Sequence, residues 1–289
     1  MRFLNFQVNG LLLVFMATVI STGCKQPKTR VIKSPPHYDF SKVQTVKLDL
    51  KLKEISGLAW DGERDEFLAH YDEAGKLYIL DKSTNAIMKE YPFAGKDDYE
   101  DIALYNGVPY VLRSDGMITK IIRDSAGVRG VEAGKLTISG TKDFETLYAD
   151  TARKALIIVC KNCAMDNKSQ VSAFAFYPDS TGFDVNPVFR MNADSIKKLS
   201  EEMAQHKTSK FQPSAASIHP VLNKLFIISS ASNQLVIADL NGKVESVFEL
   251  GKKLFPQPEG LTFKRNGDLY ISNEGVSGKA TILRFPYIH

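Results

Sequence analysis

Five segments of this sequence repeat at nearly regular spacing, and this repetition constrains the fold more than any other feature. Each segment combines an acidic or hydroxyl residue with an alternating apolar stretch. The segments begin at Glu54, Glu100, Glu145, Ser214 and Glu259. Three of the four intervals between them are 45 or 46 residues, and the remaining interval is 69 residues. Self-similarity with a period of roughly 20–50 residues is typical of solenoids and propellers.

The order of apolar strands inside each repeat predicts the architecture. A second apolar strand follows the opening one, as at residues 66–71 and 155–160, and a third and usually a fourth come after it. Four antiparallel strands in about 45 residues are typical of one blade of a β-propeller. The sequence therefore predicts an all-β fold, a propeller of five four-stranded antiparallel blades. Six blades are the alternative, which requires another unit hidden in the long interval.

The two ends of the repeat region are expected to meet in one blade. The last repeat contains only three strands, and the strand before the first repeat, residues 43–50, is available as the fourth. Pairing of these two ends removes exposed sheet edges and closes the ring. Within the long interval, residues 193–206 have a helical pattern, so we expect one short helical insertion there.

The first 33 residues differ in character from the repeats. They contain five basic residues and no acidic residue. An apolar run at residues 10–20 is shorter than the roughly 20 residues that a membrane-spanning helix needs. A basic start, a short apolar centre and small residues before a cleavage site are typical of a secretory signal peptide. The small residues before Cys24 resemble a bacterial lipobox, which implies lipidation of Cys24. A plain signal peptide and an uncleaved anchor are the alternatives.

These patterns divide the chain into three segments and predict its location. Residues 1–23 are expected to be a lipoprotein signal peptide, residues 24–38 a basic tether, and residues 39–289 the propeller domain. The predicted location is the bacterial cell envelope, where lipidated Cys24 would anchor the protein to a membrane, facing the periplasm. The first 33 residues hold a charge of +5 and the whole chain +4, which leaves −1 for the rest. Nothing in the domain therefore favours nucleic acid as a partner.

The acidic position of the repeat is the main candidate for function. The innermost strand of every blade ends at the central channel, so equivalent repeat positions would form one ring there. Glu54, Glu100, Glu145 and Glu259 would meet in this ring, with Ser214 from the fourth blade. Neighbouring carboxylates repel one another unless a cation neutralises them or protons bind. Because Ca²⁺ prefers oxygen ligands, the four glutamates predict a calcium site. In the alternative interpretation, each glutamate accepts hydrogen bonds from backbone N–H groups of the adjoining blade.

Polar residues at the ends of the second strands are expected near the same mouth of the channel. These candidate channel-lining residues, with Ser214, are Asp72, Glu73, Asn273 and Glu274. The alternative for each of them is an ordinary turn residue.

Cys160 and Cys163 form a C-x-x-C pair at the end of an apolar strand. Redox-active pairs of this kind occur in a βαβ setting, which this region lacks. No second C-x-x-C supplies the partner ligands of a metal site. We therefore expect strand-end cysteines, which a local disulfide could join in an oxidising compartment.

Three stretches of the chain resemble a known family. They are KEISGLAWD at residues 53–61, FETLYAD at 144–150 and QPEGLTFKRNGDLYISNEG at 257–275. These stretches are similar to the SdiA-regulated protein family of bacterial β-propellers, which are often exported or membrane-attached. The resemblance extends over residues 45–286 and implies the propeller fold, but it implies no particular reaction.

Two functions follow as hypotheses. The first is an envelope lipoprotein whose propeller binds a small ligand or a protein partner at its channel, with the acidic ring and Ca²⁺. The second is a metal-dependent hydrolase of the lactonase or phosphoesterase type that uses the channel carboxylates. In that enzyme the metal would polarise an ester oxygen and one carboxylate would act as general base.

Overall fold

The computed structural model describes Met1 and residues 33–167, 169–180, 182–204 and 210–289. The expected signal peptide, Cys24 and most of the expected tether lie outside the described residues. The chain divides into two units, Met1–Val31 and Ile32–His289. Every described strand and helix belongs to the second unit.

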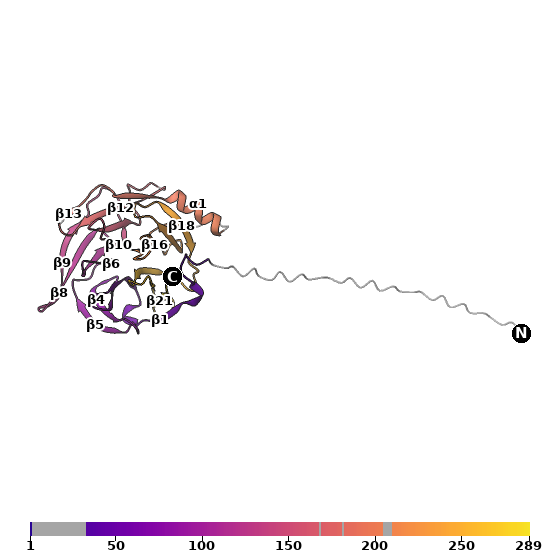
Figure 1. Ribbon diagram of the computed structural model, residues 1–289, viewed down its shortest axis with the longest axis horizontal. Helices are drawn as coiled ribbons and strands as arrows, with labels where there is room; N and C mark the ends of the chain where they lie inside the picture. The colour runs from indigo at the N-terminus through magenta and orange to yellow at the C-terminus, as the bar shows by residue number, and fades with distance from the viewer. Residues whose placement is uncertain (2–32, 168, 181, 205–209) are drawn as a thin grey trace. The chain divides into compact units, whose positions relative to one another are not determined.

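The second unit is a ring of five antiparallel sheets, as Figure 1 shows. The first blade consists of β2 (Ile55–Asp61), β3 (Glu66–Tyr71), β4 (Ala74–Asp81) and β5 (Ile87–Pro92). The second consists of β6 (Tyr99–Tyr105), β7 (Val108–Arg113), β8 (Met117–Asp124) and β9 (Gly127–Lys135). The fourth consists of β15 (Ala215–Ile218), β16 (Leu225–Ser229), β17 (Gln234–Ala238) and β18 (Val244–Glu249). The prediction of an all-β propeller with five blades is confirmed.

The fifth blade closes the ring with both ends of the domain. It consists of β19 (Pro258–Phe263), β20 (Leu269–Asn273), β21 (Thr281–Phe285) and β1 (Gln44–Lys47). Strand β1 pairs antiparallel with β21, from Gln44 opposite Arg284 to Lys47 opposite Thr281. The innermost strands β2, β6, β10, β15 and β19 each lie beside the next, and β19 lies beside β2. The predicted closure by an N-terminal strand is confirmed.

The third blade carries the helical insertion. Its regular strands are β10 (Phe144–Asp150), β11 (Ala155–Cys160), β12 (Gln170–Tyr177) and the short β13 (Gly182–Phe183). An additional strand, β14 (Phe189–Asn192), also pairs with β12 and leads into helix α1 (Ala193–Ala204). The helix packs against β18 of the next blade, which explains why the interval between repeats is long here. Among the described residues, no helix is long and apolar enough to cross a membrane.

Apolar side chains fill the spaces between neighbouring blades. Five clusters of buried residues occupy the five contacts between blades. The cluster between the fourth and fifth blades, for example, joins Phe226 and Ile228 to Leu269 and Ile271. The inner strands face two neighbouring blades, so their burial is nearly continuous, as in β11, where every residue is buried. The outermost strands, such as β5 and β9, are largely exposed. Because residues 32–289 contain all five clusters and both closing strands, we expect this segment to fold on its own.

The residues just before the first strand are attached to the domain. Tyr38, at the end of the expected tether, is buried. Its hydroxyl donates to the carbonyl of Gly267 at 2.6 Å and lies 2.7 Å from Nε2 of His219. Nδ1 of His219 accepts from the backbone N–H groups of Val221 and Leu222, both at 3.1 Å. Nε2 therefore carries the imidazole proton and donates to Tyr38. We call this arrangement the Tyr38 clasp.

Candidate functional site

A β-bulge near the start of the innermost strand positions one side chain from each of four blades. The register of β6 and β7 passes from Tyr99 directly to Asp101, so Glu100 is the extra residue. The register also skips one residue in three other innermost strands. These extra residues are Glu145 in β10, Glu259 in β19 and Ser56 in β2. A bulge breaks the strict alternation of a strand and re-aims the extra side chain. All four bulged residues line one cavity.

This acidic cavity has a volume of about 530 Å³ and lies where the innermost strands begin. Seven acidic residues and one lysine are among the described residues that line it. The charged residues are Asp72, Asp98, Glu100, Asp143, Glu145, Glu259, Glu274 and Lys161. The neutral residues are Ser56, Gln212, Ser214, Ser230, Ala231 and Gln257.

The structure places Ser56, and not Glu54, at the position equivalent to Glu100. Glu54 precedes β2 and accepts a hydrogen bond from the hydroxyl of Tyr71 at 2.5 Å. It is not among the residues that line the acidic cavity. The residue two positions before the bulge is Glu54 in the first blade, Asp98 in the second and Asp143 in the third. Glu54 is therefore the counterpart of these two aspartates. The ring expected from the sequence is therefore shifted by two residues in the first blade.

The ends of the second strands contribute further groups. Asp72 follows β3 and Glu274 follows β20, and both line the acidic cavity together with Ser214. Glu73 and Asn273 are not among the lining residues. Asn273 is fully buried, and its amide donates to Thr281 Oγ1 at 3.2 Å.

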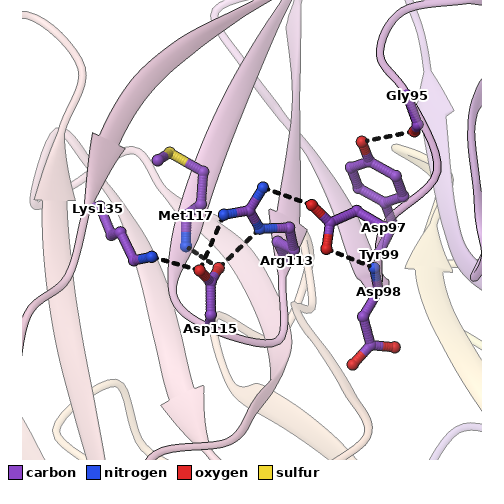
Figure 2. A network of polar contacts seen from close by, with 8 residues as sticks. All are labelled: Gly95, Asp97, Asp98, Tyr99, Arg113, Asp115, Met117 and Lys135. Atoms are coloured by element: carbon purple, nitrogen blue, oxygen red, sulfur yellow. Dashed lines mark hydrogen bonds and ion pairs between the residues drawn. The ribbon is translucent and has the colours of Figure 1, made fainter.

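A polar network in the second blade orders the residues just before β6. Arg113 donates to Asp97 at 2.7 Å and to both oxygens of Asp115 at 2.8 and 2.9 Å. Asp97 Oδ1 accepts from the backbone N–H of Asp98 at 3.0 Å. Figure 2 shows that the carboxylate of Asp98 points away from this network. The network thus orders the backbone while the Asp98 side chain remains available to the cavity, which it lines.

Three carboxylates of the second and third blades lie close enough to share a cation. Oxygen atoms of Glu100, Asp143 and Glu145 all lie within 4.8 Å of one another. Ca²⁺ binds oxygen ligands at roughly 2.3–2.6 Å, so opposite ligands lie about 5 Å apart. We call these residues the carboxylate triad. Lys161, which follows β11, forms an ion pair with Glu145 and lies 4.0 Å from Asp143.

Burial and mutual repulsion raise the pKa values of the cavity carboxyls. Burial and then the charge of Asp98 raise the pKa of Glu100 to about 8. Burial raises the pKa of Glu259 to about 7, although hydrogen bonds, including one from Ser230, act to lower it. Burial and the charge of Glu259 raise the pKa of Glu274 to about 8. Several of these carboxyls therefore hold protons near neutral pH, unless a cation binds in their place.

Between the second and third blades, a hydrogen bond comes from the residue after the bulge. Asp101 is buried, and its carboxylate accepts from the backbone N–H groups of Ile102 and, in the next blade, Leu147, both at 2.8 Å. Between these two blades, the bonding considered above for the glutamates is thus made by Asp101. Glu100 beside it remains directed to the cavity.

The two cysteines of the third blade are joined in a disulfide. Cys160 ends β11 and Cys163 lies in the following loop, with a Cα–Cα distance of 5.9 Å. Both are buried in the apolar cluster between the second and third blades. Their sulfurs are occupied by each other, so they offer no thiolate to a metal.

Comparison with known proteins agrees with this architecture. A family model described as SdiA-regulated matches residues 35–276. The chain belongs to the SdiA-regulated family. The resemblance to this family that the sequence showed is therefore confirmed. No curated protein sequence matches the chain.

Several solved structures share the fold of this family member at low sequence identity. A protein of unknown function from Bacteroides thetaiotaomicron is 16% identical with a TM-score of 0.53; the match covers 80% of this chain and 58% of that one. A glutaminyl cyclase from Myxococcus xanthus is 11% identical with a TM-score of 0.54, covering 85% and 96%. A gluconolactonase from Xanthomonas campestris is 11% identical with a TM-score of 0.51, covering 89% and 99%. At these identities the likeness shows the fold alone.

Three charged residues of the site, Asp98, Asp143 and Lys161, were missed by reasoning from the sequence. Asp143 precedes Glu145 by two residues, just as Asp98 precedes Glu100, and this repeated Asp-x-Glu pattern was the available signal. In the sequence, Lys161 is only the polar residue after the apolar stretch 155–160. Its ion pair with Glu145 depends on how β10 and β11 pair, which the spacing of the repeats does not specify.

Proposed function

We propose that this protein is a lipid-anchored envelope protein whose propeller binds a divalent cation, Ca²⁺, in the acidic cavity and uses it to bind a partner or small ligand. The observation that carries the proposal is the set of seven carboxylates and one lysine in a single cavity of about 530 Å³. Such a cavity is in the size range of small-molecule sites. The anchor is lipidated Cys24, in a protein that faces the periplasm.

The carboxylate triad is the place where the cation fits best. Its three residues come from neighbouring blades, and two of them, Glu100 and Glu145, are presented by equivalent bulges. Ca²⁺ accepts six to eight oxygen ligands in flexible geometry. The triad fills only part of that shell, so water or oxygen atoms of a bound ligand would complete it. The cavity is therefore suited to a ligand rich in oxygen.

Lys161 is a competitor for the cation, because its ammonium neutralises the same carboxylates that would hold Ca²⁺. It pairs with Glu145 and lies 4.0 Å from Asp143, and both belong to the triad. Binding of Ca²⁺ would displace this ammonium from its partners. The freed Lys161 would then lie beside the cation, where it would favour a ligand that also carries negative charge.

Calorimetric titration of residues 32–289 with CaCl₂, after treatment with EDTA, tests the cation site. We expect saturable binding by the native sequence and a loss of at least about tenfold in affinity for Glu145→Gln, which removes a ligand charge. Asp143→Asn should behave in the same way. Glu54→Gln is the matched control, because Glu54 does not line the cavity and glutamine still accepts from Tyr71.

The outcomes separate the two assignments of the ring. If Glu54→Gln weakens binding as much as Glu145→Gln, the ring expected from the sequence is correct and the one with Ser56 is wrong. If the native sequence binds no Ca²⁺, the proposed function fails.

A metal-dependent hydrolase is the second candidate, and the position of Glu274 in the acidic cavity, together with its raised pKa, favours it. Its carboxyl has a pKa of about 8 and accepts from the amide of Gln257 at 2.6 Å. A carboxylate with a pKa near neutrality is matched to act as general base toward an attacking water. Glu274 would take the proton of that water while a bound cation supplies Lewis acidity at the ester.

Turnover of a lactone and of an aryl phosphate, each with Ca²⁺ and with EDTA, distinguishes the candidates. An enzyme would show turnover that Glu274→Gln lowers at least about a hundredfold in kcat, with Ca²⁺ affinity retained. Absence of turnover with either substrate class, together with intact Ca²⁺ binding, leaves the binding protein as the better account.

A further inference from the structure

A second pocket lies on the face of the propeller opposite the acidic cavity. It has a volume of about 410 Å³ between the first and fifth blades. Glu259 near the start of β19 lines the acidic cavity, whereas Lys264, directly after the end of β19, lines this second pocket. The length of a six-residue strand, about 17 Å, therefore separates the two. We call it the basic pocket.

The charge of the basic pocket is opposite to that of the acidic cavity. Lys82, Lys264 and Arg284 line it, with Asp268 as the acidic residue among its described lining. Three cations and one carboxylate give a local charge of +2, in a domain whose overall charge is −1. Confined positive charge of this kind favours an anionic group.

Lys264 is the cation whose charge is least compensated. Arg284 donates to Asp268 at 2.7 Å and to Gln44 at 2.9 Å, and Lys82 pairs with Asp65. Within the described residues, no carboxylate forms an ion pair with Lys264.

Aromatic rings hold the Lys264 ammonium in place of a carboxylate. Its Nζ lies 4.0 Å from the ring centre of Trp60, 5.3 Å from Phe67 and 5.4 Å from Tyr270. Burial lowers the pKa of Lys264, because its ammonium is only partly solvated. Aromatic faces attract a cation without neutralising its charge, so the ammonium is oriented and still able to pair with an anion.

We propose that the basic pocket binds a phosphate group, carried by a lipid headgroup or by a soluble phosphate compound. Lys264 would supply the central charge, and Arg284 and Lys82 would flank it. Asn85, which also lines the pocket, offers a neutral side-chain amide, whereas the hydroxyl of the neighbouring Ser83 already donates to Asp81. Lysine and arginine side chains with a few neutral donors are the usual set for phosphate recognition.

The position of the pocket makes a lipid headgroup one natural source of the phosphate. Gln44 and Val46 of β1 line the pocket, and so does Asn266. Asn266 precedes Gly267, whose carbonyl accepts from Tyr38. The pocket thus lies beside the point where the segment that carries the proposed anchor joins the domain. This lipid source depends on the proposed anchor, whereas the pocket itself depends on neither the anchor nor the acidic cavity.

Unfolding of residues 32–289 in sodium phosphate, compared with sodium chloride of equal ionic strength and with EDTA present, tests the pocket. We expect phosphate to raise the melting temperature in a saturable manner, and chloride to have no such effect. Lys264→Met should weaken phosphate binding at least about tenfold, while methionine keeps an unbranched apolar side chain beside the Trp60 ring. Lys252→Met is the matched control, because Lys252 is exposed and does not line the pocket.

A second variant keeps the test decisive if Lys264→Met folds poorly. Lys82 is about half exposed at the rim, so Lys82→Ala removes a pocket cation with little effect on packing. It should weaken phosphate binding several-fold. The proposal is overturned if phosphate has no saturable effect on the native sequence, or if neither variant changes it.

Sedimentation with vesicles identifies the source of the phosphate. If vesicles of phosphatidylglycerol, but not of phosphatidylcholine, capture the native segment and inorganic phosphate releases it, the group belongs to an anionic lipid. If inorganic phosphate binds and both vesicles fail to capture the segment, the group belongs to a soluble compound. Capture that persists in the Lys264→Met and Lys82→Ala variants would count against the pocket. Calcium titration of the same variants should be unchanged, so failure here is distinct from failure of the proposed function.

Discussion

Replacing Glu100 by glutamine should stabilise the protein at alkaline pH in the absence of divalent cations. Burial and the charge of Asp98 raise the pKa of Glu100 from 4.5 to about 8. A carboxyl whose pKa is higher in the folded state favours folding when protonated. Its contribution is fully present below pH 4.5 and is lost as the pH rises through 8. Above pH 8 the ionised Glu100 therefore opposes folding, and a neutral glutamine does not.

The pKa of Glu100 sets an upper limit on this effect. A difference of 3.5 between the two pKa values corresponds to about 5 kcal/mol at high pH. Asp98, Asp143 and Glu259 contribute part of the repulsion and can adjust their own protonation. We therefore expect Glu100→Gln to raise the free energy of unfolding by about 2–3 kcal/mol at about pH 8.5, and by close to zero at about pH 4.5.

Urea unfolding of residues 32–289 at both pH values, with EDTA and then with CaCl₂, measures the effect. Calcium should stabilise the native sequence at alkaline pH and should stabilise Glu100→Gln much less, because a ligand of the carboxylate triad is gone. Glu132→Gln is the control, since Glu132 is exposed on β9. A Glu100→Gln protein that is no more stable than the native one at alkaline pH without cation would refute the reasoning.

Three further predictions concern other parts of the molecule. Tyr38→Phe should lower the free energy of unfolding by about 1–3 kcal/mol in urea, because His219 Nε2–H loses its buried acceptor; an unchanged midpoint would contradict the clasp. Lys161→Met should tighten Ca²⁺ binding about tenfold in calorimetry, because it removes the ammonium that pairs with Glu145; equal or weaker binding would show that Lys161 does not compete. Cys24→Ala should move the full-length protein from the membrane to the soluble fraction, and a variant that stays with the membranes would argue against lipidation.

The arrangement of blades could be predicted from the sequence because it depends on periodicity. Regular spacing of alternating strands specified the number of blades, and the missing strand of the last repeat specified the closure by β1. The helix at Ala193–Ala204 followed from its own amphipathic pattern in the long interval. Each of these features is local or repeats several times along the chain.

The composition of the site depends on register, which the repeat alone did not specify. Aligning acidic residues placed Glu54 with Glu100, whereas the bulge in β2 places Ser56 there. A bulge changes which residue faces the channel without changing the length of the repeat. The ion pair of Lys161 with Glu145 also depends on pairing between strands, so it was visible only in three dimensions.

The Tyr38 clasp has a mechanical consequence for a protein held by its N-terminus. A pulling force on the proposed anchor would otherwise reach Gln44 first and peel β1 from β21, one residue pair after another. Tyr38 precedes β1 and is bonded to His219 of the fourth blade and Gly267 of the fifth. The fourth and fifth blades therefore bear the force first. The pairing of β1 with β21 bears none of it until the hydrogen bonds of the Tyr38 clasp break.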